Sequence, residues 1–174
     1  MDIHELLIEE IRSATLNVLS TMLGLDAEPG AASMSRVETG PSHGVAAMVG
    51  VAGPYSGSGS VVCTEPVACR MAGAMLMAEY TEVNDDVLDA MGEIANMVIG
   101  NIKTNLEERF GAMALTTPTV IHGGDFSTRA SGKHTWTVTP FTMEGAEFFV
   151  QMMLVESPTR VSCGPGIPVA LAHH

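Results

Sequence analysis

With 174 residues, of which 46% are hydrophobic, the chain is long enough to bury one sizeable core, and this excludes a disordered polypeptide. Twenty acidic residues against eight Lys and Arg give a formal net charge of −12, which excludes nucleic-acid binding and adsorption to an anionic membrane surface. No apolar run approaches the roughly 20 residues that span a bilayer, and the acidic, amphipathic N-terminus is unlike a signal peptide, so we expect a cytoplasmic protein.

The N-terminal segment has helical periodicity. Apolar residues recur every three or four positions over residues 2–25, which predicts a helix with one buried face, and Gly24 can end it. Residues 26–42 contain two prolines and two glycines, so they predict a loop or a poorly formed edge strand.

A strand hairpin and a second helix are predicted next. Residues 44–51 are small or β-branched and predict a strand. The glycine-rich run 53–60 lacks the Lys-Ser or Lys-Thr of a phosphate-binding loop, so we interpret it as a turn before a second strand at 59–64. Pro66 suits the first turn of a helix that extends to about residue 80. Three methionines of this helix are assigned to the core, because thioethers fill irregular gaps well: Met71, Met75 and Met77.

Residues 84–111 show the strongest helical pattern of the chain. Asn84 or Asp85 can cap the N-terminus, acidic residues fill the first turn, and Gly111 follows the end. The apolar stripe consists of Leu88, Met91, Ala95, Val98, Ile99, Ile102, Leu106 and Phe110.

The C-terminal third predicts further strands. Residues 113–121 form a strand that contains Pro118, and because proline cannot donate a ladder hydrogen bond, this strand should lie at an edge or carry a bulge. Residues 123–134 predict a loop. Two strands at 135–143 and 146–156 follow, joined by a tight turn, and therefore predict an antiparallel hairpin.

Together these elements predict an α+β fold, with an antiparallel sheet and two long helices packed together on it. Residues 1–158 form one domain, and residues 159–174 form a Gly- and Pro-containing tail whose final two histidines we interpret as a tag remnant. Strands 44–51 and 148–155 are apolar on both alternating faces, which indicates a sheet covered on both sides and is consistent with a dimer.

The helix at 84–111 also has a polar face. At roughly 100° per residue, Asp89, Glu93, Asn96 and Gly100 fall within an arc of about 60°, away from the apolar stripe. Glu93 and Asn96 are therefore neighbours that point outward together. A carboxylate beside a carboxamide, with glycine one turn on, is a polar patch that a partner's surface can approach closely.

The spacing Asp89-x3-Glu93-x2-Asn96, followed by 21 residues and then Pro118, resembles the signature of the CheC/CheX/FliY phosphatases, which dephosphorylate the response regulator CheY. No second Glu-x2-Asn occurs in the helices of this chain. CheC is similar to a duplicated unit with two such helices, whereas CheX has one. The chain therefore resembles CheX, from its first helix to about Glu156.

The resemblance implies a phosphatase that hydrolyses the aspartyl phosphate of a CheY-type receiver domain. Asn96 would enter the receiver's active site and orient the attacking water, and Glu93 would pair with the receiver's lysine. Asp89, Gly100 and Pro118 are supporting signature positions. The phosphorylated receiver, not this chain, would carry the Mg²⁺ ion. The resemblance also implies a homodimer.

Other functions stay open. A receiver-binding or scaffold module that docks without hydrolysis would not need the carboxamide of Asn96, and a purely structural dimerisation domain would make the polar face incidental. His4, His43, His122 and His134 are scattered without the spacing of metal ligands. The three cysteines show no Cys-x2-Cys pair. We therefore expect no metal site and no disulfide framework.

Overall fold

The structure, a computed structural model, describes residues 1–127, 129 and 132–158. The helices are α1 (Ile3–Val18), extended by the π-helical turn η1 (Leu19–Leu23), α2 (Glu65–Leu76) and α3 (Asp85–Phe110). The strands are β1 (Glu28–Pro29), β2 (Ser33–Ser35), β3 (His43–Ala52), β4 (Tyr55–Cys63), β5 (Ala114–Leu115), β6 (Thr119–Gly124), β7 (Trp136–Met143) and β8 (Ala146–Glu156). The predicted tail and Cys163 lie outside the described residues.

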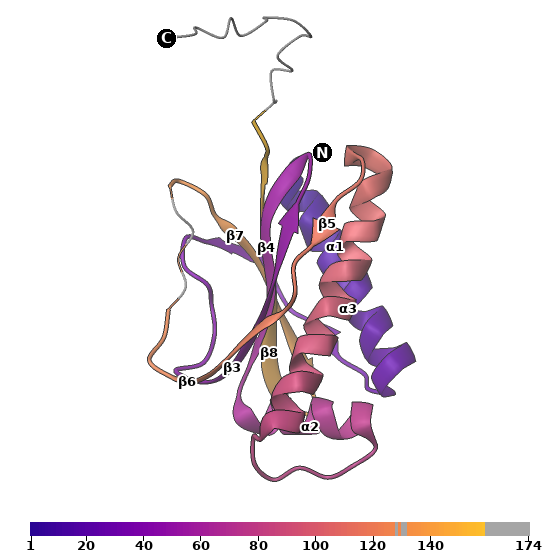
Figure 1. The fold of residues 1–174 in the computed structure, drawn as a ribbon, viewed down its shortest axis with the longest axis vertical. Helices are drawn as coiled ribbons and strands as arrows, with labels where there is room; N and C mark the ends of the chain where they lie inside the picture. The colour runs from indigo at the N-terminus through magenta and orange to yellow at the C-terminus, as the bar shows by residue number, and fades with distance from the viewer. Residues whose placement is uncertain (128, 130–131, 159–174) are drawn as a thin grey trace, which may run out of the picture.

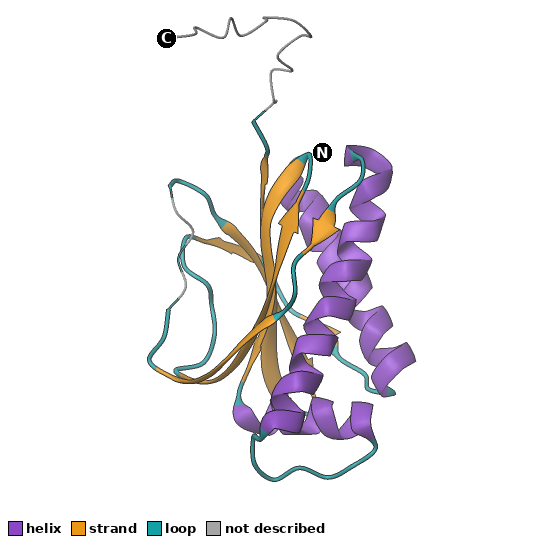
Figure 2. Ribbon diagram, viewed as in Figure 1, coloured by secondary structure: helices purple, strands orange, loops and turns teal. Residues whose placement is uncertain are grey.

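These strands form one sheet in which neighbouring strands are antiparallel. Their order is β1-β7-β8-β4-β3-β5, with β2 also paired to β7 and β6 also paired to β3. The helices lie on one side of the sheet, and α3 packs against both α1 and α2 (Figures 1 and 2). The predicted fold, an antiparallel sheet that carries two long helices packed together, is confirmed.

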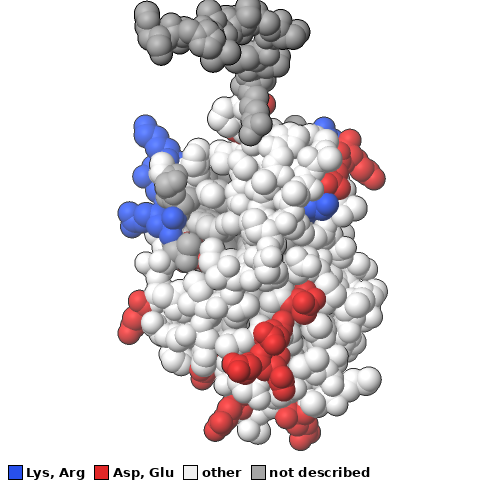
Figure 3. All heavy atoms as spheres, viewed as in Figure 1, with Lys and Arg blue, Asp and Glu red and all other residues white. Residues whose placement is uncertain are grey.

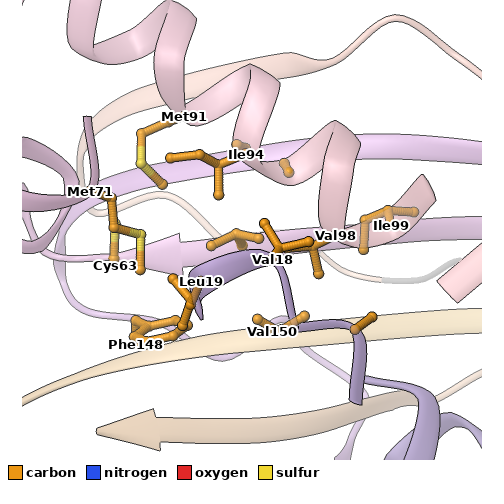
Figure 4. Close-up of a cluster of buried hydrophobic side chains, with 14 of the residues drawn as sticks. Val18, Leu19, Cys63, Met71, Met91, Ile94, Val98, Ile99, Phe148 and Val150 are labelled. Atoms are coloured by element: carbon orange, nitrogen blue, oxygen red, sulfur yellow. The ribbon is translucent and has the colours of Figure 1, made fainter. Parts of the chain in front are cut away.

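The core fills the space between helices and sheet. Alternate residues of β3 point into it, and Val45, Ala47 and Val49 have no exposed surface. Figure 4 shows side chains of α3, among them Ile94 and Val98, close to those of the first helix and the sheet. Burial of apolar surface is the main favourable term in folding, and the buried side chains of α3 keep its backbone in place.

The sequence predicts the ends of α3 correctly. Asn84 precedes the helix with extended backbone, and its side-chain oxygen accepts a hydrogen bond from the Val87 N–H at 3.0 Å. Gly111 follows the last residue with φ of +90°. The buried stripe is wider than predicted, because Val87, Ala90 and Ile94 also face the core. Of the predicted stripe, Leu88 and Phe110 are half-buried.

The N-terminal prediction is also confirmed. The first helix ends at Gly24, whose left-handed backbone (φ +63°) suits glycine. Residues 26–42 contain two short strands, β1 and β2, which pair with the edge of β7 that β8 does not occupy. This agrees with the predicted loop or poorly formed edge strand.

The face of the sheet opposite the helices is covered by the segment between β2 and β3 (Figure 1). The Thr39 N–H donates to Gln151 Oε1 at 2.8 Å, and Gln151 Nε2 donates to the Thr39 carbonyl at 2.7 Å. The Ser60 hydroxyl donates to the Glu38 carboxylate. The buried apolar side chains on this face are Ala46, Val62, Trp136 and Val138. The sheet is therefore covered on both sides, as predicted, and one cover is part of the same chain.

The predicted turn at 53–60 is wrong in its extent. Only Gly53 and Pro54 connect the strands, and β4 starts at Tyr55. The glycines are needed for close packing within the strand: a Cβ on Gly57 would lie 1.9 Å from the Met153 carbonyl oxygen, and a Cβ on Gly59 would lie 2.4 Å from Ile99 Cδ1 of α3. Glycine within a strand often marks such a close approach, but one sequence cannot distinguish it from a turn.

We expect Gly57→Ala to destabilise the protein by about 1–3 kcal/mol or more, because β4 and β8 must separate to admit the methyl group. Urea denaturation monitored by circular dichroism measures the free energy of unfolding. Ser58→Ala, at the next position of the strand, is the control and should leave the free energy nearly unchanged. Equal stability of the two variants would contradict the packing argument.

The second helix is shorter than predicted. It ends at Leu76, and Met77 adopts a left-handed backbone (φ +53°) while the N–H groups of Met77 and Ala78 bond to the Gly73 carbonyl. This C-terminal cap directs Met77 away from the helix axis, and its side chain is 88% exposed. Its assignment to the core is therefore wrong. Met71 is fully buried and Met75 packs partly buried against the core, as predicted.

The β7–β8 hairpin is confirmed, with Glu144 and Gly145 at φ of +50° and +79° in its two-residue turn.

Cys63 and Cys69 are buried free thiols, and burial raises the pKa of Cys63 to about 12, so this thiol is inert at neutral pH. In the described part of the chain, no helix is both long and apolar enough to cross a bilayer.

Candidate functional site

The polar face of α3 lies at the surface of the molecule, as the helical spacing predicts. Asp89 and Glu93 are exposed, while Asn96 and Gly100 are half-buried. Glu93 and Asn96 are three residues apart on one helix, so their Cβ atoms are separated by roughly 5–6 Å. Directly beneath them Ala90, Ile94 and Ala95 are buried in the core. A rigid element therefore presents both functional groups.

Neither Glu93 nor Asn96 uses its side chain within this chain. Among the described residues, neither forms a side-chain hydrogen bond or an ion pair. Within the described part of the chain, Asp89 likewise makes no hydrogen bond to Glu93. The carboxylate and the carboxamide keep their full bonding capacity for a partner.

A groove runs beside this face of α3. Its wall on the helix includes Asp89, Gly92 and Glu93, and the opposite wall consists of Thr117, Pro118 and Val120. Pro118 thus lies across the groove from the two acidic residues, although it follows them by more than twenty positions in the sequence. The structure brings Asp89, Glu93 and Pro118 to one groove, with Asn96 one helical turn further along.

The wall that contains Pro118 is a β-bulge. Leu115 pairs with Val51 and Thr119 pairs with Met48, so three residues of this segment face two of β3. The extra residue interrupts the ladder between β5 and β6, where the absent N–H of Pro118 is no loss. The single predicted strand at 113–121 is therefore two strands, and the prediction that it lies at an edge or carries a bulge is confirmed.

The bulge is fixed to the sheet through Gly50. Its N–H donates to Thr116 Oγ1 at 2.8 Å, and its carbonyl accepts the Thr116 N–H at 2.9 Å. A Cβ at Gly50 would lie 2.9 Å from the Thr116 side chain, so glycine permits this close approach. The position of Pro118 relative to α3 is thus set by hydrogen bonds to a central strand.

Gly92 is the point on α3 that faces the bulge. A Cβ at this position would lie 3.4 Å from Val120 Cγ2 and 3.6 Å from Pro118 Cβ. Gly92, Thr117 and Val120 also line the groove, although they were not predicted as members of the site. A glycine inside a strongly periodic helix was a usable signal, because it destabilises a helix unless it serves packing or function.

Gly100 faces its own chain more than expected. It is half-buried, and a Cβ there would point to Leu115 Cδ1 at 3.7 Å, an ordinary contact distance. The chain's own packing therefore does not require glycine at this position.

Acidic side chains dominate the surroundings of the groove. Figure 3 shows them gathered over the N-terminal half of α3, where Asp85, Asp86, Asp89 and Glu93 lie. Asp85 and Asp86 also stabilise the helix through its dipole. This surface favours a partner that presents a positive charge to Glu93.

The titratable groups that line the groove are the carboxylates of Asp85, Asp89 and Glu93. No histidine, cysteine or lysine occurs among its lining residues. A carboxylate and a carboxamide on a rigid helix can form ion pairs and position a molecule through hydrogen bonds. The site is therefore suited to complete a reactive centre that a partner brings.

The comparisons with known proteins identify the family and the fold of the chain. The sequence profile of the family Chemotaxis phosphatase CheX matches residues 45–142. The CheY-P phosphatase CheX of Thermotoga maritima is 25% identical over 128 residues, which cover 72% of this chain and 81% of that protein.

Solved structures share the fold over most of the chain. The chemotaxis protein CheX from Desulfovibrio desulfuricans is 33% identical with a TM-score of 0.76, covering 87% of this chain and 99% of that one. A complex of CheX with CheY, BeF3 and Mg²⁺ from Borrelia burgdorferi contains a chain of the same fold, with 24% identity, a TM-score of 0.74 and coverage of 86% and 97%. Because the family profile matches more than half of this chain, the chain belongs to the chemotaxis phosphatase CheX family.

Proposed function

We propose that this protein hydrolyses the aspartyl phosphate of a CheY-type receiver domain. The observation that carries the proposal is the pair Glu93 and Asn96, which a rigid helix presents at the surface of a CheX-family fold without any bond to the rest of the described chain. The T. maritima relative is a CheY-P phosphatase, and in the B. burgdorferi complex the partner is CheY.

Asn96 positions the attacking water in this proposal. Hydrolysis requires a water in line with the leaving carboxylate oxygen of the phosphorylated aspartate. A carboxamide can accept one hydrogen bond from this water and donate another to the phosphoryl group, and it does not titrate near neutral pH. Because Asn96 is held by a helix packed on the core, little backbone conformational entropy is lost when it enters the receiver's site.

Glu93 provides the docking contact. Its exposed carboxylate pairs with the lysine that the receiver class carries in its active site, which fixes the depth and direction in which Asn96 enters. The groove between α3 and the Pro118 bulge gives this contact a second wall. Asp89 and Pro118 line the same groove and shape the docking surface, and Gly100 lies one turn beyond Asn96.

The magnesium ion belongs to the receiver in this mechanism. When bound in the receiver, it would supply positive charge to the transferring phosphoryl group. The groove of this chain contributes the acidic residues Asp85, Asp89 and Glu93, and its role in the proposal is to position the receiver.

The proposal is tested by the decay of a ³²P-labelled CheY-type receiver in the presence of Mg²⁺, with and without this protein. Catalytic amounts of the protein should accelerate loss of the label with multiple turnovers. Receiver binding without acceleration would instead identify the protein as a docking or scaffold module, and the absence of both across the receivers of the source organism would refute the assignment.

A homodimer and a cytoplasmic location complete the proposal. Both rest on the family resemblance alone. The second face of the sheet gives no argument for a dimer, because the chain's own segment before β3 already covers it. Analytical ultracentrifugation of the full chain measures the mass directly, and a monomer at micromolar concentration would refute the dimer.

A further inference from the structure

Three side chains from distant parts of the sequence meet at one end of the sheet, outside the groove. His43 begins β3, Glu65 is the first residue of α2, and His122 lies in β6. His43 Nε2 is 3.1 Å from Glu65 Oε1, and His122 Nε2 is 2.5 Å from the same oxygen. Both imidazoles therefore direct Nε2 toward one point, and we name this group the His-Glu-His cluster.

The strand register explains why the two histidines converge. His43 lies opposite Gly124 and His122 lies opposite Val45, so the histidines are diagonal neighbours on the helix side of the sheet. Their ring centroids are 6.1 Å apart. A Cβ at Gly124 would lie 2.8 Å from His43 Nδ1, so the glycine leaves the space that the imidazole of His43 occupies.

The carboxylate comes from a different kind of element. Glu65 lies in the first turn of α2, next to Pro66, and this short connection after β4 places it over the two strands. The side chains are 31–60% exposed, which gives an ion access from solvent.

We propose that the His-Glu-His cluster binds a divalent transition-metal ion, with Zn²⁺ as the best match. Two imidazole nitrogens and one carboxylate oxygen are a ligand set that zinc proteins use, with water in the fourth position. Imidazole ligands disfavour Mg²⁺ and Ca²⁺, which prefer oxygen. The site is therefore separate from the Mg²⁺ of the receiver and does not depend on the proposed phosphatase activity.

The distances are close to those that a tetrahedral ion requires. The three ligand atoms lie within 4.8 Å of one another. With metal–ligand bonds of about 2.0–2.2 Å, tetrahedral ligands are about 3.4 Å apart. The half-exposed side chains reach this spacing by small rotations, in which the metal replaces the two Nε2 contacts to Glu65.

The bound ion would connect three elements. It would tie α2 to β3 and to β6. In β6, Val120 lies two positions before His122 and lines the groove of the candidate site. The ion would thus stabilise the native state, because the unfolded chain does not hold these three groups together.

Isothermal titration of the full chain with ZnCl2, after removal of metals by chelator, tests the proposal. We expect one Zn²⁺ per chain at this cluster, and His43→Ala, His122→Ala and Glu65→Gln should each weaken that binding by at least about 10–100-fold, more than loss of an outer-shell partner does. Zn²⁺ should raise the Tm of the parent and leave the Tm of His122→Ala nearly unchanged.

Two controls separate this cluster from other histidines. His134→Ala removes an exposed histidine elsewhere, and the His173→Ala, His174→Ala double variant removes the pair at the C-terminus, so both proteins should keep the site. Visible absorption of the Co²⁺-loaded parent should indicate nitrogen and oxygen ligands in four-coordinate geometry and be lost in His122→Ala. Binding that is absent, or that disappears with the C-terminal pair and persists in His122→Ala, would overturn the proposal.

Discussion

Asn96→Ala is expected to reduce the acceleration of receiver dephosphorylation by at least about 100-fold while receiver binding persists. Alanine removes the only group that this protein contributes to the position of the attacking water in the proposed mechanism, and loss of alignment on this scale costs at least two orders of magnitude in rate. The half-buried Asn96 makes no hydrogen bond within the described chain, so the folded structure should not change. Single-turnover decay of the labelled receiver measures the rate.

Asn101→Ala provides a matched control, because Asn101 is a half-buried asparagine on the same helix. It lies about 140° around the helix from Asn96, away from the polar face. This variant should retain the parent rate. If Asn96→Ala dephosphorylates the receiver as fast as the parent does, the water-positioning role is refuted, even if the protein is a phosphatase.

Glu93→Ala should instead impair docking. The proposed pair with the receiver's lysine becomes partly desolvated when the surfaces meet, and truncation of one partner then costs about 2–5 kcal/mol, or about 30-fold or more in Kd. Because Glu93 forms no ion pair in the free protein, this variant removes no internal contact and its Tm should remain close to that of the parent. Fluorescence anisotropy with a labelled receiver measures Kd.

Glu108→Ala is the control for charge. Glu108 is exposed on α3, roughly 22 Å along the axis from Glu93, and its removal changes the net charge by the same amount. It should leave Kd nearly unchanged. An equal loss of affinity in the two variants would indicate a general electrostatic effect, and unchanged affinity in both would exclude Glu93 as a docking residue.

Most of the fold is accessible from the sequence because its elements have strong local signals. The periodic apolar residues and the cap at Asn84 define α3, and the turn at Glu144 and Gly145 defines the last hairpin. The errors occur where one residue type has two uses. Gly57 and Gly59 serve close packing in β4 and were interpreted as a turn, and Met77 lies past the end of α2 and was assigned to the core.

The polar face of α3 is determined by the sequence alone, because the period of a helix places Asp89, Glu93 and Asn96 together before any tertiary contact forms. The wall across the groove depends on tertiary structure, since only the register of β5 and β6 on β3 brings the Pro118 bulge against Gly92. The same holds for the His-Glu-His cluster. Its residues are separated by tens of positions and appear scattered in the sequence, yet strand pairing and the start of α2 direct them to one point. Local periodicity is encoded by neighbouring residues, whereas the meeting of distant segments depends on how the whole sheet pairs.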